Sequence, residues 1–416
     1  MIYSQVSEPV RDSRLTVKPL EEQMVWNGGL QPFLVRTRKG TMICQLQMPE
    51  RSHNDGRIVF HWRIATIVSR DGGVTWQAVS RKPGENELYM EGGGTELRDG
   101  SIVMLDTYVT PHADSGYGAG LMNISRDEWK TVEEPVDMLF HLPDVNFYGN
   151  DDGGNPHHAI RLHRRVIELP DGDLLACLYG WFHGDNTPST YVASMMKCRS
   201  MLLRSGDQGE TWKLVSTIAV DPEVGAEGFV EPDFVRLSQG PYEGRLLCFM
   251  RTGRELYGCH SDDEGVTWSE AKPVDFGVAD IYRTEDWAHL YEEKNDFHGY
   301  PPCLHGAYVD PNIIELKNGV LALAFGLRIP EKLCWLNPSH ERNGNYIAFS
   351  FDQGATWSHV LQLTSGILTT HYMSVEEIED NLLYVMYDHG HWDYGYWNGE
   401  TGRYTCARKL ELHFAL

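Results

Sequence analysis

Six stretches of the chain share one pattern of apolar and polar positions. Each consists of an apolar run, a short polar turn and a second apolar run, and the turn carries a glycine or, once, an asparagine. This pattern is typical of a β-hairpin. The stretches are residues 33–46, 94–105, 165–180, 234–250, 312–326 and 375–387. Each is therefore expected to form two neighbouring antiparallel strands.

The turns of these hairpins recur at nearly regular intervals. The turn residues are Gly40, Gly100, Gly172, Gly244, Gly319 and Asn381. Successive ones are 60 to 75 residues apart, which leaves room for about four short strands per repeat, as in a propeller blade. The pattern predicts an all-β chain folded as a single domain over residues 1–416, a six-bladed β-propeller with four-stranded antiparallel blades.

A second motif, Ser-x-Asp-x-Gly-x-Thr-Trp, follows four of the hairpins. Its copies begin at Ser69, Ser205, Ser261 and Ser350, and a degenerate copy begins at Ser125. The Asp carboxylate of such an octet can accept backbone N–H groups, the Gly can adopt a positive φ, and the Trp can pack into the sheet. We expect a structural turn rather than a calcium loop, because the ligand spacing of an EF-hand is absent.

These octets resemble the Asp-boxes of the sialidase (neuraminidase) superfamily, and the resemblance extends over nearly the whole chain. Members of that superfamily are six-bladed propellers, so the resemblance implies the same fold as the hairpin repeat. It also implies an exo-acting, retaining glycoside hydrolase that releases a terminal acidic sugar from a glycan or oligosaccharide.

Aligning the hairpins makes the start of each predicted inner strand comparable. The alignment uses the turn residue in five copies and the strand itself in the fourth, whose turn is longer. All six aligned positions are polar: Gln31, Glu91, His163, Glu231, Asp310 and Tyr372. Inner strands of a propeller surround its channel, so these side chains are expected at one mouth of the channel, where they are candidate substrate contacts.

Several of these residues also match stretches that carry the catalytic groups of sialidases. The resemblance implies that Tyr372 is the nucleophile and that Glu231 takes its proton, since a phenol is otherwise a weak nucleophile. It implies that Arg251 and Arg342 bind a substrate carboxylate through charge-assisted hydrogen bonds. It places the general acid at Asp55, in the loop after the first strand.

One arginine of the sialidase pattern is missing. Where the family begins its first inner strand with Arg-Ile-Pro, this chain has Leu30, Gln31 and Pro32. Loss of one arginine removes charge-assisted hydrogen bonds to a carboxylate. The sugar is therefore left open among sialic acid, another ulosonic acid, a uronic-acid glycoside, and a sugar with no carboxylate at that position.

A stretch rich in histidine and arginine offers different chemistry. Residues 157–165 contain His157, His158, Arg161, His163, Arg164 and Arg165. In a uronate-directed polysaccharide lyase, Arg neutralises the uronate and His or Tyr removes a proton; a His-dependent glycosidase would use similar groups. His158 and His163 are candidate substrate contacts on either hypothesis. A non-catalytic glycan-binding propeller is the third alternative.

Composition restricts the partners. The formal net charge of −23 disfavours nucleic acid and anionic membranes, so a carbohydrate partner is expected. The eight cysteines form no Cys-x-x-Cys pair, and no compact ligand motif occurs, so neither a metal nor a cofactor is predicted. Free buried thiols and the absence of a signal-like start favour a cytoplasmic location, and no apolar run is long enough to span a membrane.

Overall fold

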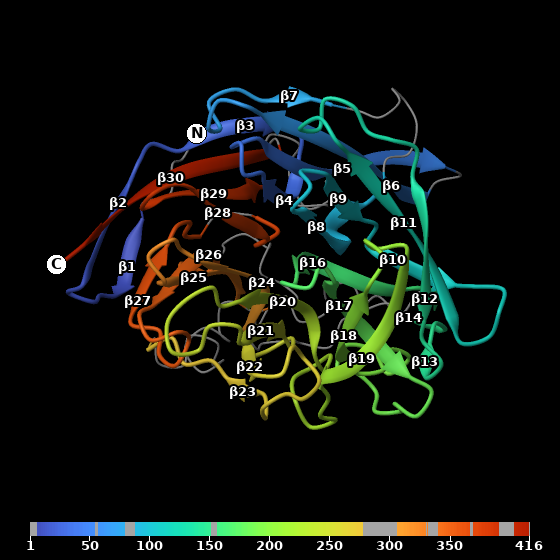
Figure 1. Cartoon of the computed structure of the whole chain (residues 1–416). Helices are drawn as coiled ribbons and strands as arrows, with labels where there is room; N and C mark the ends of the chain where they lie inside the picture. Colours follow the sequence, from blue (N-terminus) through green and yellow to red (C-terminus); the bar gives the residue numbers. More distant parts are fainter. Residues whose placement is uncertain are drawn as a thin grey trace.

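The computed structural model describes residues 6–54, 57–79, 88–150, 156–277, 306–329, 331, 340–366, 369–390 and 403–415, with side chains omitted at 49–54 and 57–63. The regular elements named over these ranges are β-strands and one short 3-10 helix, η1 (Met90–Gly92), joined by turns and loops. The strands are arranged in a propeller-like ring (Figure 1). The predicted all-β class is confirmed. The described residues include no helix that could cross a membrane.

Two sheets of the ring consist of four consecutive strands. The first contains β4 (Leu30–Arg36), β5 (Met42–Asn54), β6 (Arg57–Ser69) and β7 (Gln77–Ala78). The second contains β20 (Val230–Arg236), β21 (Leu246–Arg251), β22 (Tyr257–Ser261) and β23 (Lys272–Pro273). All neighbours in both sheets are antiparallel.

A ten-stranded sheet joins two further antiparallel runs. One run is β8 (Gly93–Glu96), β9 (Ile102–Leu105), β11 (Tyr117–Ser125) and β12 (Val136–His141), and the other is β16 (Ile160–Glu168), β17 (Leu174–Phe182), β18 (Arg199–Ser205) and β19 (Thr211–Ala219). Strands β12 and β19 pair in parallel. The remaining strands are β10 (Tyr108–Pro111), β13 (Val145–Asn146) and a separate pair, β14 (Gly149–Asn150) with β15 (Pro156–His157).

The last two sheets take in the N-terminal strands. One consists of β24 (Ala307–Glu315), β25 (Leu321–Arg328), β26 (Gly344–Ser350) and β27 (His359–Gln362), with β1 (Ser7–Val10) beside β27. The other consists of β28 (Met373–Glu379), β29 (Leu382–His389) and β30 (Tyr404–Phe414), with β2 (Leu15–Pro19) and β3 (Gln23–Asn27) paired to β30. The N-terminal strands β2 and β3 thus pair with the C-terminal strand β30, which joins the two ends of the chain in one sheet.

The six predicted hairpins are all antiparallel strand pairs. They are β4–β5, β8–β9, β16–β17, β20–β21, β24–β25 and β28–β29. Their first strands surround the middle of the ring (Figure 1). Side-chain oxygens tie successive inner strands together, because Asp233 Oδ2 accepts the Ile313 N–H at 2.7 Å and Asn312 Oδ1 accepts the Val375 N–H at 2.9 Å.

The octets form hydrogen-bonded turns, as their residue types predict. In the second copy, Asp207 accepts the Thr211 N–H at 2.8 Å and the Thr211 hydroxyl at 2.6 Å, and Ser205 Oγ accepts the Gly209 N–H at 2.9 Å. Trp212 is fully buried in the apolar core between the sheets. The degenerate copy uses Asp127 in the same way. The octets are thus structural turns, and their tryptophan is buried in two copies (Trp212 and Trp357) and half-buried against the core in the other two (Trp76 and Trp268).

At five of the inner strands a non-glycine residue adopts a left-handed conformation, in four of them at a β-bulge and in the last just before β28. These residues are Gln31 (φ 49°), Arg164 (φ 65°), Glu231 (φ 48°), Asp310 (φ 54°) and His371 (φ 70°). The turn-based alignment is therefore off by one at His163 and Tyr372, because the number of residues between bulge and turn differs among the hairpins. Left-handed backbone costs free energy for such residues and often occurs near functional sites.

Candidate active site

A cavity of about 710 Å³ lies among the ends of the inner strands. Five of the six aligned polar residues line it: Gln31, Glu91, His163, Glu231 and Tyr372. The sixth, Asp310, is fully buried and is not among the lining residues. The sequence repeat therefore predicted a set of residues that the fold brings to one cavity.

Glu231, Tyr372 and Arg251 meet in this cavity. The Tyr372 hydroxyl donates a hydrogen bond to Glu231 Oε1. Arg251 Nη1 donates to the same carboxylate oxygen at 2.8 Å and lies 3.3 Å from the Tyr372 oxygen. The other oxygen of Glu231 accepts the Asp310 N–H at 3.2 Å. All of these groups are buried, so the carboxylate is held from three sides.

The pKa values of Glu231 and Tyr372 are shifted in opposite directions. Burial raises the pKa of the Glu231 carboxyl, but the charge of Arg251, the nearby His163 and the hydrogen bond from Tyr372 lower it to about 2. Burial and the Glu231 charge raise the pKa of the Tyr372 phenol well above its ordinary value. Glu231 is thus ionised and Tyr372 protonated at neutral pH.

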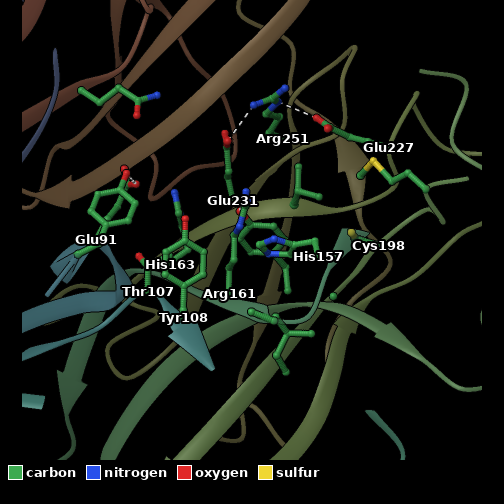
Figure 2. A pocket seen from close by; sticks show the side chains of 18 of the residues that line it. Glu91, Thr107, Tyr108, His157, Arg161, His163, Cys198, Glu227, Glu231 and Arg251 are labelled. Atoms are coloured by element: carbon green, nitrogen blue, oxygen red, sulfur yellow. Dashed lines mark hydrogen bonds and ion pairs between the residues drawn. The ribbon is translucent and has the colours of Figure 1, made fainter. Parts of the chain in front are cut away.

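Arg251 faces a protein carboxylate at each of its three nitrogens. Nε lies 2.7 Å from Glu227 Oε1, Nη1 lies 2.8 Å from Glu231 Oε1, and Nη2 lies 2.9 Å from Glu331 Oε1. Figure 2 shows Glu231 and Glu227 on the two sides of Arg251. Although burial opposes it, the charges of Glu227 and Glu231 keep the pKa of Arg251 well above its ordinary value. Sequence reasoning missed Glu227 and Glu331, which lie outside the hairpin repeat.

Arg342 does not belong to the described lining of the cavity. It is half-buried in the turn before β26, where its N–H donates to His340 Nδ1 at 3.1 Å. Arg328, at the end of β25, flanks Tyr372 instead. Its guanidinium carbon lies 5.8 Å from the centre of the Tyr372 ring, and its Nη2 donates to the Thr370 carbonyl at 2.8 Å. Arg328 is thus a second arginine near Tyr372, besides Arg251, and sequence reasoning missed it. The role of Arg342 in substrate binding stays a prediction.

The predicted general acid, Asp55, lies outside the described residues. At the position of the missing family arginine, Leu30 is fully buried and supplies no charge. Gln31, the next residue, lines the cavity and donates its backbone N–H to Asp388 at 2.7 Å.

His158 is exposed and packs edge-on against Tyr148, with ring centres 5.1 Å apart. Its neighbour His157 lines the cavity instead, together with Arg161 and Tyr108 (Figure 2). His157, rather than the expected His158, is therefore the histidine of this pair that can contact a ligand in the cavity. Arg161 Nη1 donates to the Tyr179 hydroxyl at 3.4 Å.

Arg164 is a fully buried cation beside the cavity that sequence reasoning did not single out as a site residue. Its Nη2 pairs with Asp310 and lies 3.4 Å from Glu91 Oε1, and its Nη1 donates to Ser374 Oγ at 2.8 Å. Burial raises the pKa of both carboxyls, although Arg164 opposes this. The left-handed φ of Arg164 marks it as the backbone equivalent of Glu231.

Two groups of side chains in the described part of the chain have a spacing that could hold a metal ion. They are Glu91, His163 and Asp310, and Glu22, His389 and Cys406. In each group an arginine already faces the carboxylates: Arg164 in the first, and Arg408, 3.5 Å from Glu22, in the second. A guanidinium at such a site opposes binding of a second cation.

Comparisons with known proteins give structural likeness at low sequence identity. No family model matches the chain, and no curated protein matches it. A crystal structure of a protein of unknown function from Dyadobacter fermentans superposes with a TM-score of 0.61 and 16% identity, covering 95% of this chain and 99% of that one.

Two similar structures are those of named glycosidases. The NanB sialidase of Streptococcus pneumoniae gives a TM-score of 0.54 at 13% identity, over 97% of this chain and 70% of that one. A Penicillium chrysogenum α-L-arabinanase, solved with arabinobiose, gives 0.54 at 12% identity, over 94% and 98%. At these identities the likeness is one of architecture, and the chain shares with these proteins an all-β, propeller-like fold.

Proposed function

We propose that this protein is a retaining exo-glycoside hydrolase whose active site is the cavity described above. The observation that carries the proposal is the Tyr372–Glu231 hydrogen bond, with Arg251 fixing the carboxylate. A buried nucleophile hydrogen-bonded to an ionised base, which a third group orients, is a typical arrangement for covalent catalysis. The sialidase and arabinanase activities of two similar structures agree with it by analogy.

In the proposed first step, the Tyr372 oxygen bonds to the anomeric carbon while the phenolic proton passes to Glu231. The leaving oxygen takes a proton from a general acid, for which Asp55 stays the proposal. Because the pKa of Glu231 is about 2, its proton transfer has to accompany carbon–oxygen bond formation rather than precede it. Water then attacks the same carbon, its proton goes to Asp55, and Glu231 returns the proton to Tyr372.

The finer description of the fold belongs to the same proposal. We take each run of four antiparallel strands as a blade, with the N-terminal strands completing the last, which gives six blades. The hydrogen-bonded octets then correspond to Asp-boxes. This description accounts for the six hairpins and for the ten-stranded sheet, in which the parallel β12–β19 pair joins two neighbouring blades.

The ion pairs of Arg251 bear on whether the sugar carries a carboxylate. A substrate carboxylate would have to displace Glu227, Glu231 or Glu331 from this arginine, and Arg342 is not among the described lining residues. We therefore propose a terminal sugar and do not restrict it to the acidic sugars that the sequence suggested.

A panel of 4-methylumbelliferyl glycosides tests the activity. It includes N-acetylneuraminate, glucuronate, galactose, xylose and arabinofuranose glycosides, each assayed with the wild-type protein and with Tyr372→Phe. We expect release of the fluorophore from at least one glycoside and a loss of roughly 1,000-fold or more in the variant. Wild-type rates in Tyr372→Phe, with its circular dichroism unchanged, would remove Tyr372 from the mechanism.

A uronate-directed lyase is the second candidate. The observation that favours it is the presence of His157, Arg161 and a neutral His163 in the same cavity as Tyr372. Cleavage of a uronate polymer with a rise in absorbance at about 235 nm, from the unsaturated product, would favour this candidate. Release of a sugar without that absorbance favours the hydrolase.

A further inference from the structure

One wall of the cavity contains buried polar atoms without hydrogen-bond partners. Among the described residues, Thr107 Oγ1 and His163 Nε2 have no partner, and neither does Glu91 Oε1, which has only the ion pair with Arg164. All three residues line the cavity. Buried polar groups are nearly always paired, because an unpaired one has lost its water without replacement. Such a group on a cavity wall indicates that a ligand supplies the missing partner.

The three side chains belong to one continuous patch. The backbone of Thr107 connects the segments that carry the other two, because its N–H donates to the Tyr89 carbonyl at 2.6 Å and its carbonyl accepts the Leu162 N–H at 2.9 Å. Glu91 and His163 have potential ligand atoms within 4.8 Å of each other. Figure 2 shows Glu91, Thr107 and His163 grouped together.

The hydrogen-bonding character of the patch is that of a site for hydroxyl groups. His163 Nδ1 lies 3.2 Å from the Pro232 carbonyl, which can only accept, so Nδ1 carries the proton and Nε2 presents a lone pair. Burial, assisted by Arg164, lowers the pKa of His163 to about 3, so the ring is uncharged. Thr107 can donate and accept, and Glu91 can accept, so each can bind a sugar hydroxyl.

We infer that Glu91, Thr107 and His163 form a subsite that binds two neighbouring hydroxyls of the sugar ring. This inference rests on the proposed function, since the sugar is the one whose anomeric carbon lies at Tyr372. One hydroxyl donates to His163 Nε2, and the Thr107 hydroxyl bonds to the next. Sugars with hydroxyls at both positions are expected to bind more tightly than deoxy sugars. A missing hydroxyl would leave the buried polar atom that faces it without a hydrogen-bond partner.

The other occupant with suitable chemistry is a divalent cation. Glu91, His163 and Asp310 have the required spacing. The guanidinium of Arg164, however, already pairs with Asp310 and lies 3.4 Å from Glu91. A cation there would be repelled by Arg164 in a site of low dielectric, so a neutral hydroxyl is favoured.

Equilibrium binding tests the subsite separately from catalysis. Isothermal titration of methyl β-galactoside, methyl β-xyloside and methyl α-arabinofuranoside is done on Tyr372→Phe, which cannot turn over. In this background we expect Thr107→Val to weaken the best-bound glycoside about 10-fold, since it removes one hydroxyl at nearly constant volume. Thr107→Ser keeps the hydroxyl and is expected to stay within about 2-fold.

His163 is tested in the same background with a matched pair. His163→Leu is expected to weaken binding about 10-fold, and His163→Gln, which keeps an acceptor, by less. The inference is overturned if none of the three glycosides binds, or if Thr107→Val binds as tightly as Thr107→Ser. It is also overturned if Zn²⁺ or Ca²⁺ titrates one to one and His163→Leu abolishes that binding.

The two proposals fail in different ways. If the Thr107 and His163 variants bind the glycoside more weakly but the wild-type protein hydrolyses none, the proposed glycosidase activity is contradicted. The proposed hydroxyl-binding subsite is then still supported. Hydrolysis that requires Tyr372, with unchanged affinity in the Thr107 and His163 variants, contradicts only the subsite. Thermal melting of each variant checks that the fold is kept.

Discussion

The Tyr372 hydroxyl donates a hydrogen bond to Glu231 Oε1, although 141 residues separate the two in the chain. Each is held by its own strand: Glu231 sits in a left-handed bulge with φ 48° in β20, and Tyr372 follows the left-handed His371 just before β28. Because both side chains are buried and bonded, the contact is fixed before any substrate arrives. Such preorganisation is what covalent catalysis requires.

Glu231→Gln tests the proposed proton acceptor. The amide keeps the shape of the side chain but cannot take the phenolic proton, so kcat should fall by about 100- to 10,000-fold. Glu227→Gln is the matched control, because Glu227 also pairs with Arg251 and no contact between it and Tyr372 is among those described. A similar loss in both variants would show that the charge around Arg251, rather than proton transfer, determines the rate.

Arg251→Met tests the stabilising role of the buried cation. The substitution leaves Glu227, Glu231 and Glu331 without their shared partner, and breaking a buried ion pair from one side costs about 3–5 kcal/mol. Urea unfolding should report a loss of this size. Arg245→Met, which breaks an ion pair with the exposed Asp262, should cost less than about 1 kcal/mol. Equal losses would contradict the account of Arg251.

The stability of the protein should depend on pH through His163. Its pKa is about 3 in the folded protein and ordinarily 6.5, so the unfolded chain binds more protons between these pH values. Above pH 6.5 the histidine is neutral in both states and costs no free energy of unfolding. As the pH falls from 6.5 toward 3, only the unfolded chain takes up the proton, so the free energy of unfolding decreases.

At pH 5 the wild-type protein should have lost about 2 kcal/mol more than His163→Gln, relative to pH 7. Urea unfolding of both proteins at the two pH values measures the difference. Parallel losses would mean that His163 is protonated in the folded state.

Asp207→Ala tests the octet turn. The carboxylate accepts a backbone N–H and a hydroxyl from Thr211, and its loss should cost about 1–2 kcal/mol in urea unfolding. Asp137→Ala, at an exposed position in β12, should change stability by no more than about 0.5 kcal/mol. An effect of Asp207→Ala no larger than this control would show that the octet contributes nothing to stability.

The hairpins and the octets could be predicted from sequence because their signals are local. A glycine or asparagine turn between apolar runs, or an Asp four residues before a Thr, acts within one short segment. Gln31, Glu231 and Asp310 carry a further local signal, because each is followed by a proline in its bulge. These three bulge residues can therefore be recognised from sequence without counting back from the turn. Arg164 and His371 lack that proline, so only the distance to the turn could place them, and this distance differs by one residue from that of Gln31 and Asp310.

The partners of Arg251 could not be predicted. Glu227 lies before β20 and Glu331 after β25, outside any repeated pattern, and only the arrangement of the strands brings both to the same guanidinium. The same holds for Arg328, because no motif in the sequence indicated its position beside Tyr372. Ion pairs between residues of neighbouring sheets produce no repeated pattern in a single sequence, so they cannot be recognised from it.

Covalent trapping tests whether Tyr372 attacks the anomeric carbon of the sugar. The protein is incubated with the activated 2-fluoro derivative of whichever sugar the glycoside panel shows to be released, and the labelled peptide is identified by mass spectrometry. We expect one sugar bound to Tyr372 and no label in Tyr372→Phe. A label on Glu231, or hydrolysis with inversion of the anomeric centre and no label, would contradict this expectation.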